Sequence, residues 1–194
     1  MNINSPRFNA MQSVKREFFA LRNGVIADVM RRAGSPFRII FGLNLPQLVE
    51  IAGRFGPDAE LARLLWENRS TRCSMLLAPM LIPKETVAES DALRLVEESP
   101  DTEVIDVLCH RLLRHLDFAP ALVGILADNE RDLSRYAALR LALNLLNMGK
   151  ADPAALRLLA ESELSRTAAL TAPVSRQLLD EISFLTDPDA DLSE

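Results

Sequence analysis

The chain has few aromatic residues, few glycines and few cysteines, and each shortage excludes a class of protein. Of the 194 residues, 5% are aromatic, 7 are glycine and 2 are cysteine. Strands favour β-branched and aromatic side chains, so a mainly β fold is disfavoured, and two cysteines cannot build a disulfide framework. The glycines match no phosphate-binding loop, so we expect neither a nucleotide nor any other cofactor.

Long apolar runs are also absent. No run approaches the roughly 18 residues of a transmembrane helix, and the N-terminal stretch MNINSPRFNAMQS contains no apolar signal core. Hydrophobic residues make up 48% of the chain and charged residues 25%, which is typical of a soluble globular protein. We therefore expect no membrane partner and a cytoplasmic location.

Positive charge is not in excess either, because the net charge is −5. The acids are concentrated at the end of the chain, where residues 187–194 contain Asp187, Asp189, Asp191 and Glu194 and no base. This composition predicts a disordered acidic tail. Without the tail, acids and bases nearly balance, so a basic groove on the folded part is compatible with the composition.

The apolar residues that are present recur with helical spacing, and none of the segments shows sustained alternation. The spacing predicts helices over residues 10–33, 45–55, 58–67, 70–82, 85–98, 102–116, 118–127, 131–147, 153–162 and 172–185. The joints between them are too short for an interdomain linker. We therefore expect a single domain over residues 1–186.

Three segments of the chain are similar to one another, and each reads as a helix, a polar joint and a more apolar helix. The first helices end at Trp66, Val96 and Leu126, and the second helices begin near Arg72, Val104 and Arg135. A period near 30 residues built of helix pairs is typical of an α-solenoid. The sequence thus predicts an all-α HEAT-like-repeat α-solenoid, in which antiparallel helix pairs stack into a single curved domain.

The second helices keep their polar residues on narrow stripes. Stacked in parallel, they would place these stripes along one concave, mostly basic surface that contains one acid. The surface is either a line of phosphate contacts or a solvated helix edge with local ion pairs. On the first interpretation, the predicted nucleic-acid contacts are Arg69, Arg72, His110, Arg114, Arg135 and Arg140.

The two cysteines suggest thiol or metal chemistry, but the pattern around them is poor. Cys73 lies in the first turn of its predicted helix beside Arg72, so it is either a reactive thiol or a half-buried structural residue. Cys109 lies among leucines, as a core residue does. Cys109 and His110 point about 100° apart on a helix, and no further cluster completes a ligand set. We predict no metal site.

Residues 41–82 contain the pieces of a known pattern: Gly42 to Ala52, then Leu61-Ala62 with Leu65-Trp66, then Arg72 with Leu77-Ala78. In these pieces the chain resembles the DNA alkylation repair family of HEAT-like-repeat proteins, the superfamily of HEAT-like-repeat DNA glycosylases. The likeness continues more weakly through residues 102–116 and 131–146 and covers roughly half of the chain. It implies a concave basic surface that grips the backbone of duplex DNA. Glycosylase members of the family release alkylated purines with aromatic side chains and an aspartate.

Position by position, Asp106 matches the catalytic aspartate of the family. Thr102 stands where an aromatic residue is expected, Cys73 stands where a glutamate is expected, and Arg135-Tyr136 stands where the family has two arginines. The resemblance therefore implies a divergent member that binds nucleic acid and lacks most of the aromatic cradle for a base. Any enzymatic activity would be that of an alkylpurine DNA glycosylase. The alternative is a non-catalytic scaffold that binds a protein partner on the concave face.

Overall fold

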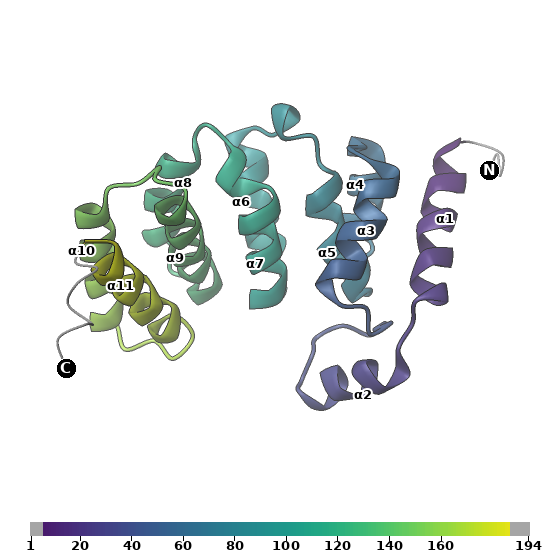
Figure 1. Ribbon diagram of the computed structural model, residues 1–194, viewed down its shortest axis with the longest axis horizontal. Coiled ribbons are helices and arrows are strands. Elements are labelled where there is room, and N and C mark those ends of the chain that lie inside the picture. Colours follow the sequence, from purple (N-terminus) through teal and green to yellow (C-terminus); the bar gives the residue numbers. More distant parts are fainter. Residues whose placement is uncertain (1–5, 187–194) are drawn as a thin grey trace. The chain divides into compact units, whose positions relative to one another are not determined.

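The computed structural model describes residues 6–186, with side chains from residue 10 onward, and this part of the chain is built of α-helices (Figure 1). Its residues include no strand, and the one β-type contact is an isolated bridge between Ile39 and Thr71. The chain forms two compact units, Met1–Val87 and Ala88–Glu194. We call them the N-terminal unit and the C-terminal unit and describe each by itself.

The N-terminal unit is held together around helix α5. Its helices are α1 (Pro6–Ala20), α2 (Gly24–Arg32), α3 (Leu45–Phe55), α4 (Ala59–Glu67) and α5 (Arg72–Leu81), and a 3₁₀ turn, η1 (Lys84–Thr86), follows them. Helices α3 and α4 both pack on α5, and α1 packs on α4. Helix α5 is buried from Arg72 to Pro79, which explains why its sequence is apolar on nearly every face.

The single helix predicted over residues 10–33 is wrong, because the chain turns between α1 and α2. Asn23 has extended backbone angles, and its side chain accepts a hydrogen bond from the Ile26 N–H at 3.1 Å. A side-chain acceptor at this position stabilises the start of a new helix. The Asn23-Gly24 pair is therefore a helix start inside an otherwise helical pattern.

The C-terminal unit consists of three helix pairs. Its helices are α6 (Glu89–Glu98), α7 (Thr102–Arg111), α8 (Ala119–Ala127), α9 (Asp132–Asn147), α10 (Pro153–Ser165) and α11 (Ala172–Thr186), with a 3₁₀ turn, η2 (Leu113–His115), after α7. Helix α9 packs on both α7 and α11, so the second helices of the three pairs are neighbours. Asp101 caps α7 and Asp152 caps α10.

The predicted repeat is confirmed in these pairs. Helices α5, α7 and α9 begin at Arg72, Thr102 and Asp132, each after a first helix and a short joint. The fold is an all-α HEAT-like-repeat solenoid. The predictions of one domain over residues 1–186 and of a concave surface stay predictions, and the predicted acidic tail lies outside the described residues. No described helix is long and apolar enough to span a bilayer.

Candidate nucleic-acid interface

Asp106 on α7 lies at the centre of the polar contacts between the second helices of the C-terminal unit. The hydroxyl of Tyr136 donates a hydrogen bond to Asp106 Oδ1 at 2.9 Å, and Arg140 Nε forms an ion pair with the same oxygen at 2.7 Å. The Nε contact lacks hydrogen-bond alignment, so it is electrostatic in character. The Asp106 side chain keeps 37% of its surface exposed. Both partners come from α9, so the carboxylate ties α7 to α9.

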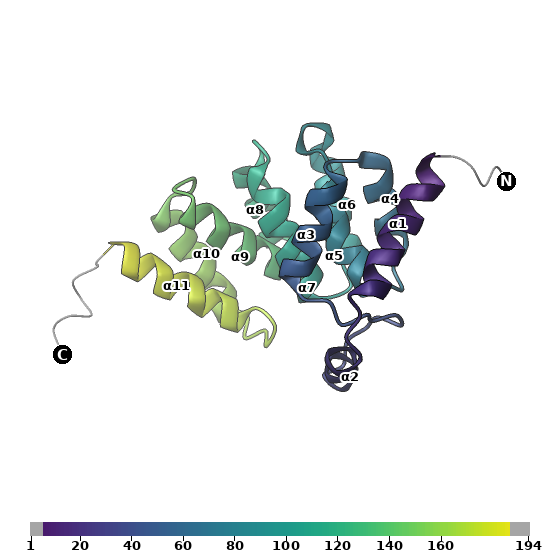
Figure 2. The same cartoon turned by 45° about the vertical axis from the view of Figure 1, so that its right-hand side comes forward.

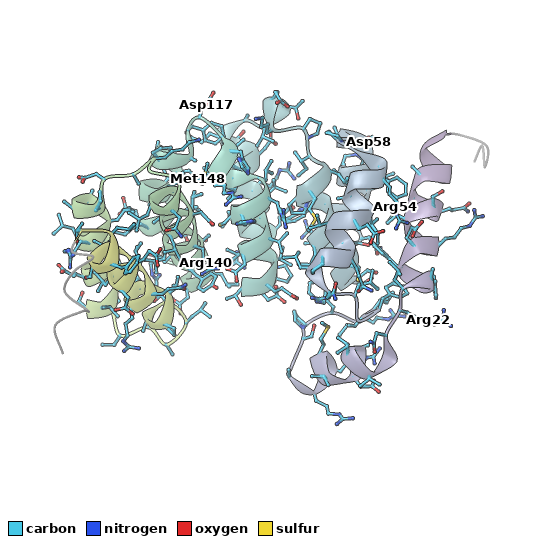
Figure 3. All side chains as sticks on the ribbon, viewed as in Figure 1. Arg22, Arg54, Asp58, Asp117, Arg140 and Met148 are labelled. Carbon is cyan, nitrogen blue, oxygen red and sulfur yellow. The ribbon has the colours of Figure 1, made fainter. Side chains whose placement is uncertain are left out.

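Further contacts extend this arrangement along α9. The amide of Asn144 donates to the Arg140 carbonyl at 2.9 Å, and its Oδ1 lies 3.4 Å from Nδ1 of His110. Arg140, labelled in Figure 3, also donates through Nη1 to Gln177 Oε1 on α11 at 3.2 Å. The result is a continuous row of side chains across three helices. We call it the polar stripe: Asp106, His110, Tyr136, Arg140, Asn144 and Gln177.

Positive charge accumulates where α7 ends and η2 begins. His110, Arg111, Arg114 and His115, which we call the basic cluster, fall within six consecutive residues. Arg114 Nε donates to His115 Nε2 at 3.2 Å, and Arg111 Nε is buried without a hydrogen-bond partner. Among the described residues, no carboxylate forms an ion pair with Arg111 or Arg114. The charges of Arg111 and Arg114 are thus not neutralised by an ion pair among the described residues.

The pKa values in the basic cluster respond to this excess charge. Partial burial lowers the pKa of Arg114, and the charge of Arg111 lowers it further. Partial burial is also the main reason why the pKa of His110 lies below its ordinary value. The charges of Arg114, Arg111 and Arg140 act in the same direction, against the hydrogen bond with Asn144. An anion placed here would relieve repulsion between cations.

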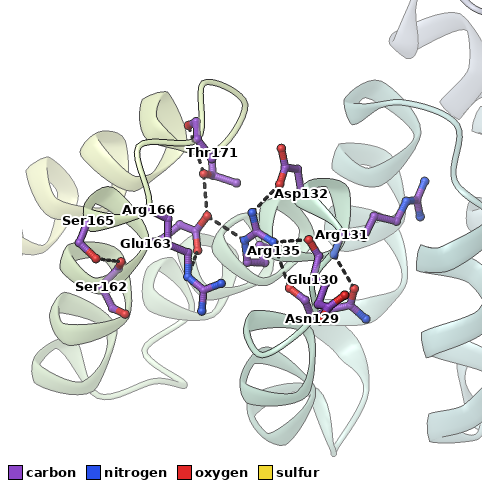
Figure 4. A network of polar contacts seen from close by, with 11 residues as sticks. Asn129, Glu130, Arg131, Asp132, Arg135, Ser162, Glu163, Ser165, Arg166 and Thr171 are labelled. Carbon is purple, nitrogen blue, oxygen red and sulfur yellow. Dashed lines mark hydrogen bonds and ion pairs between the residues drawn. The ribbon is translucent and has the colours of Figure 1, made fainter.

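Arg135, which was predicted to contact nucleic acid, lies in the interior of the C-terminal unit (Figure 4). Its Nε donates to Glu163 Oε1 at 3.0 Å, and its Nη1 donates to the carbonyls of Asn129 and Glu130 at 3.1 and 2.6 Å. Its Nη2 pairs with Asp132. With every terminal nitrogen engaged and 6% of the residue exposed, Arg135 ties α9 to α10 and is removed from the predicted interface.

Arg72 is removed from the predicted interface for the same reason. Only 4% of it is exposed, and its Nη1 donates to the Leu43 carbonyl at 2.9 Å. It therefore joins the start of α5 to the segment before α3. Arg69 is exposed, but it lies in the N-terminal unit, whereas His110, Arg114 and Arg140 lie together in the C-terminal unit.

Both cysteines are buried, with no surface exposed, and neither forms a disulfide. Burial, and secondarily the charge of Asp106, raises the pKa of the Cys109 thiol. Cys73 is more deeply buried than the half-buried alternative, so neither thiol is accessible as a nucleophile. Within the described part of the chain, no three His, Cys, Asp or Glu side chains are grouped as metal ligands.

Sequence reasoning missed some members of the site. Gln177 carried no signal, because nothing in α11 marks one glutamine as a partner of Arg140. The bond between Tyr136 and Asp106 had a usable signal. These two residues are 30 positions apart, so they occupy equivalent places in neighbouring repeats.

Comparison with known proteins supports the fold. No protein-family model matches the chain, and no curated protein sequence matches it. Among solved structures, it is similar to a protein from "a new family of proteins related to the HEAT-like repeat DNA glycosylases with affinity for branched DNA structures". The TM-score is 0.76 at 16% sequence identity, and the match covers 93% of this chain and 79% of that chain. The resemblance seen in the sequence is confirmed at the level of the fold.

Proposed function

We propose that the chain binds branched DNA, with the basic cluster and Arg140 contacting the phosphate backbone. The observation that carries the proposal is the unneutralised charge of Arg111 and Arg114 beside the polar stripe. Phosphate groups are the natural partners of clustered guanidinium groups, which can donate two hydrogen bonds to one phosphate. The choice of branched DNA is supported by the affinity of the structural neighbour for such structures.

Asp106 acts as an anchor for Arg140 and Tyr136 on this proposal, and not as a catalyst. A glycosylase needs an anion that stabilises positive charge developing on the sugar. Here a cation lies 2.7 Å from Oδ1 and a hydroxyl donates to the same atom, so much of the negative charge is already balanced. Thr102 also offers no aromatic face to a flipped base. We expect no release of alkylated purines.

The salt dependence of binding tests the phosphate contacts. A fluorescent four-way junction and a linear duplex of equal length are titrated with the full chain at 50 to 200 mM salt. Each phosphate contact contributes about 0.9 to the slope of log affinity against log salt concentration. Arg111→Gln combined with Arg114→Gln should therefore reduce the slope by about 1.8. This corresponds to roughly a twelvefold smaller loss of affinity over that range.

Arg94→Gln is the matched control. Arg94 is an exposed arginine on α6 of the same unit and is already paired with Asp91 and Glu98. Its replacement should leave the slope unchanged. The proposal fails if the wild-type chain binds neither DNA at 50 mM salt, or if the paired substitution and the control have equal effects.

Base release provides a separate test of the anchoring role. Incubation with methylated duplex DNA should liberate no 7-methyladenine or 7-methylguanine above the level of a blank reaction. Release that disappears in Asp106→Asn would instead establish a glycosylase. The protein-interaction scaffold stays a prediction.

A further inference from the structure

Helix α2 of the N-terminal unit carries apolar side chains that are partly or largely exposed. Val25 is 75% exposed, Val29 is 55% exposed and Ile26 is 39% exposed. In both Figures 1 and 2, α2 stands apart from α3, α4 and α5. Ala27, on the opposite side of the helix, is the residue of α2 that is buried. The helix therefore presents a small apolar face to solvent.

Arginines lie at the C-terminal end of this apolar face and in the segment that follows it. Arg32 follows Val25 and Val29 at helical spacing and thus extends the same stripe. Arg31 pairs with Asp28 at 2.6 Å, whereas neither Arg32 nor the exposed Arg38 pairs with a described carboxylate. Asp28 is the acid described as paired with one of these arginines, so the surface of α2 has both apolar side chains and a net positive charge.

The segment before α3 holds α2 in a fixed position. The Asn23 N–H donates to the Phe41 carbonyl at 2.7 Å. A Cβ atom on Gly42 would lie 2.1 Å from the Asn23 carbonyl oxygen and 2.9 Å from the Ala27 nitrogen, so the two backbones touch there. A surface fixed before binding loses little conformational entropy when it binds. The exposure of α2 is thus a property of the folded unit.

We propose that α2 recognises the branch point of DNA, with Val25, Ile26 and Val29 contacting unstacked bases and Arg32 and Arg38 contacting the flanking phosphates. This inference rests on the proposed function. Bases in a regular duplex are stacked and offer no open apolar face at the helix axis. The open form of a branch point leaves base faces unstacked between phosphates, which suits an apolar face with guanidinium groups at its end. Apolar side chains are known to enter base steps in this way.

Discrimination between junction and duplex tests the inference. Val25→Ser combined with Val29→Ser removes apolar area without removing charge. With the full chain, it should weaken binding to a four-way junction by about tenfold, because burial of exposed apolar area contributes to affinity. Binding to a linear duplex should change less than about twofold, since phosphate contacts are unaltered. Leu158→Ser is the matched control, because Leu158 is an apolar residue of α10 in the other unit and is 68% exposed. This control should change the affinity for neither the junction nor the duplex.

A fluorescent base analogue gives a direct signal. With 2-aminopurine at the branch point, binding of the wild-type chain should change the fluorescence, and the Val25/Val29 variant should lose that change. A melting curve equal to that of the wild type establishes that the variant is folded, and Val25→Ser alone, at the most exposed of the three positions, serves as a milder second variant. Arg32→Ala should instead weaken binding to the junction and to the duplex equally, and it should reduce the slope of log affinity against log salt concentration by about 1.

Several results would overturn the inference. One is an equal loss of junction and duplex binding in the Val25/Val29 variant, and another is junction binding that does not change. Binding of the wild type to vesicles of phosphatidylglycerol, lost in the same variant, would assign the face to a membrane. Failure of the proposed function is distinct, because there the Arg111/Arg114 variant would leave duplex binding and its salt slope intact.

Discussion

Replacing Arg135 with alanine should destabilise the C-terminal unit strongly and affect DNA binding only through folding. In the native chain the Glu163 side chain is 5% exposed. After the substitution its carboxylate keeps the hydrogen bond from Thr171 at 2.8 Å and a longer contact with Arg166 at 3.4 Å. Removal of one partner from a buried ion pair costs about 3–5 kcal/mol. Arg166 is 48% exposed and compensates in part, so we expect about 3 kcal/mol.

Thermal unfolding by circular dichroism measures this loss. A loss of about 3 kcal/mol lowers Tm by about 6–12 °C if the whole chain unfolds cooperatively, and by about 12–24 °C if the C-terminal unit unfolds alone. Addition of Glu163→Gln to Arg135→Ala should recover part of the loss, because the stranded charge is then removed. The control is Arg140→Ala, whose ion pair with Asp106 is partly exposed and contributes about 1 kcal/mol or less. A Tm close to that of the wild type, together with weaker DNA binding, would show that Arg135 is a surface contact.

Three further predictions concern other parts of the fold. Gly42→Ala should lower the Tm more than Gly149→Ala, because both glycines have positive φ but only Gly42 has backbone atoms where a Cβ would lie. The pKa of His110 is lowered in the folded state, so the free energy of unfolding should fall as the pH drops below about 6.5. Between pH 7.5 and pH 5.5 the Tm of the wild type should therefore fall more than the Tm of His110→Gln. Asp106→Asn should increase affinity for duplex DNA and steepen its salt dependence, because Arg140 loses its carboxylate partner. Weaker binding in that variant would contradict the idea that Asp106 offsets the charge of Arg140.

The helices were largely predictable because their ends have chemical markers. The predicted helix over residues 45–55 agrees with α3, where Asn44 and Gln47 form a capping box. Apolar spacing then continues until a turn residue such as Gly56 ends it. The break between α1 and α2 was missed because the spacing on both sides of Asn23 is helical. The break is set by the Asn23 cap, a local hydrogen bond that the spacing of apolar residues does not reveal.

The site was less predictable, because a polar residue on a mostly apolar helix has two explanations. Arg72 and Arg135 have the same sequence signal as Arg114, namely a base on a second helix. Arg72 finds the carbonyl of Leu43 and Arg135 finds Glu163, both from distant parts of the chain. Such partners depend on tertiary packing, so helical spacing alone cannot separate a buried arginine from an exposed one.

The repeat period does contain part of the missing information. Asp106 and Tyr136 both occupy the fifth position of their helices, and His110 and Arg140 both occupy the ninth. Neighbouring second helices lie side by side, so equivalent or adjacent positions on one face come into contact, as the bond from Tyr136 and the ion pair from Arg140 to Asp106 show. Alignment of the repeats would therefore have predicted that Asp106 meets residues of α9.

The position of one carboxylate then determines which cations of the C-terminal unit remain available to an anion. Asp106 lies next to Arg140 and balances its charge, whereas Arg111 and Arg114, a turn or more further along the chain, have no described carboxylate partner. The residue that matches a catalytic aspartate in the resemblance thus divides the surface into a neutralised part and a cationic part. The aspartate therefore has a structural role that needs no aromatic cradle, because it joins α7 to α9 and leaves Arg111 and Arg114 without a carboxylate partner.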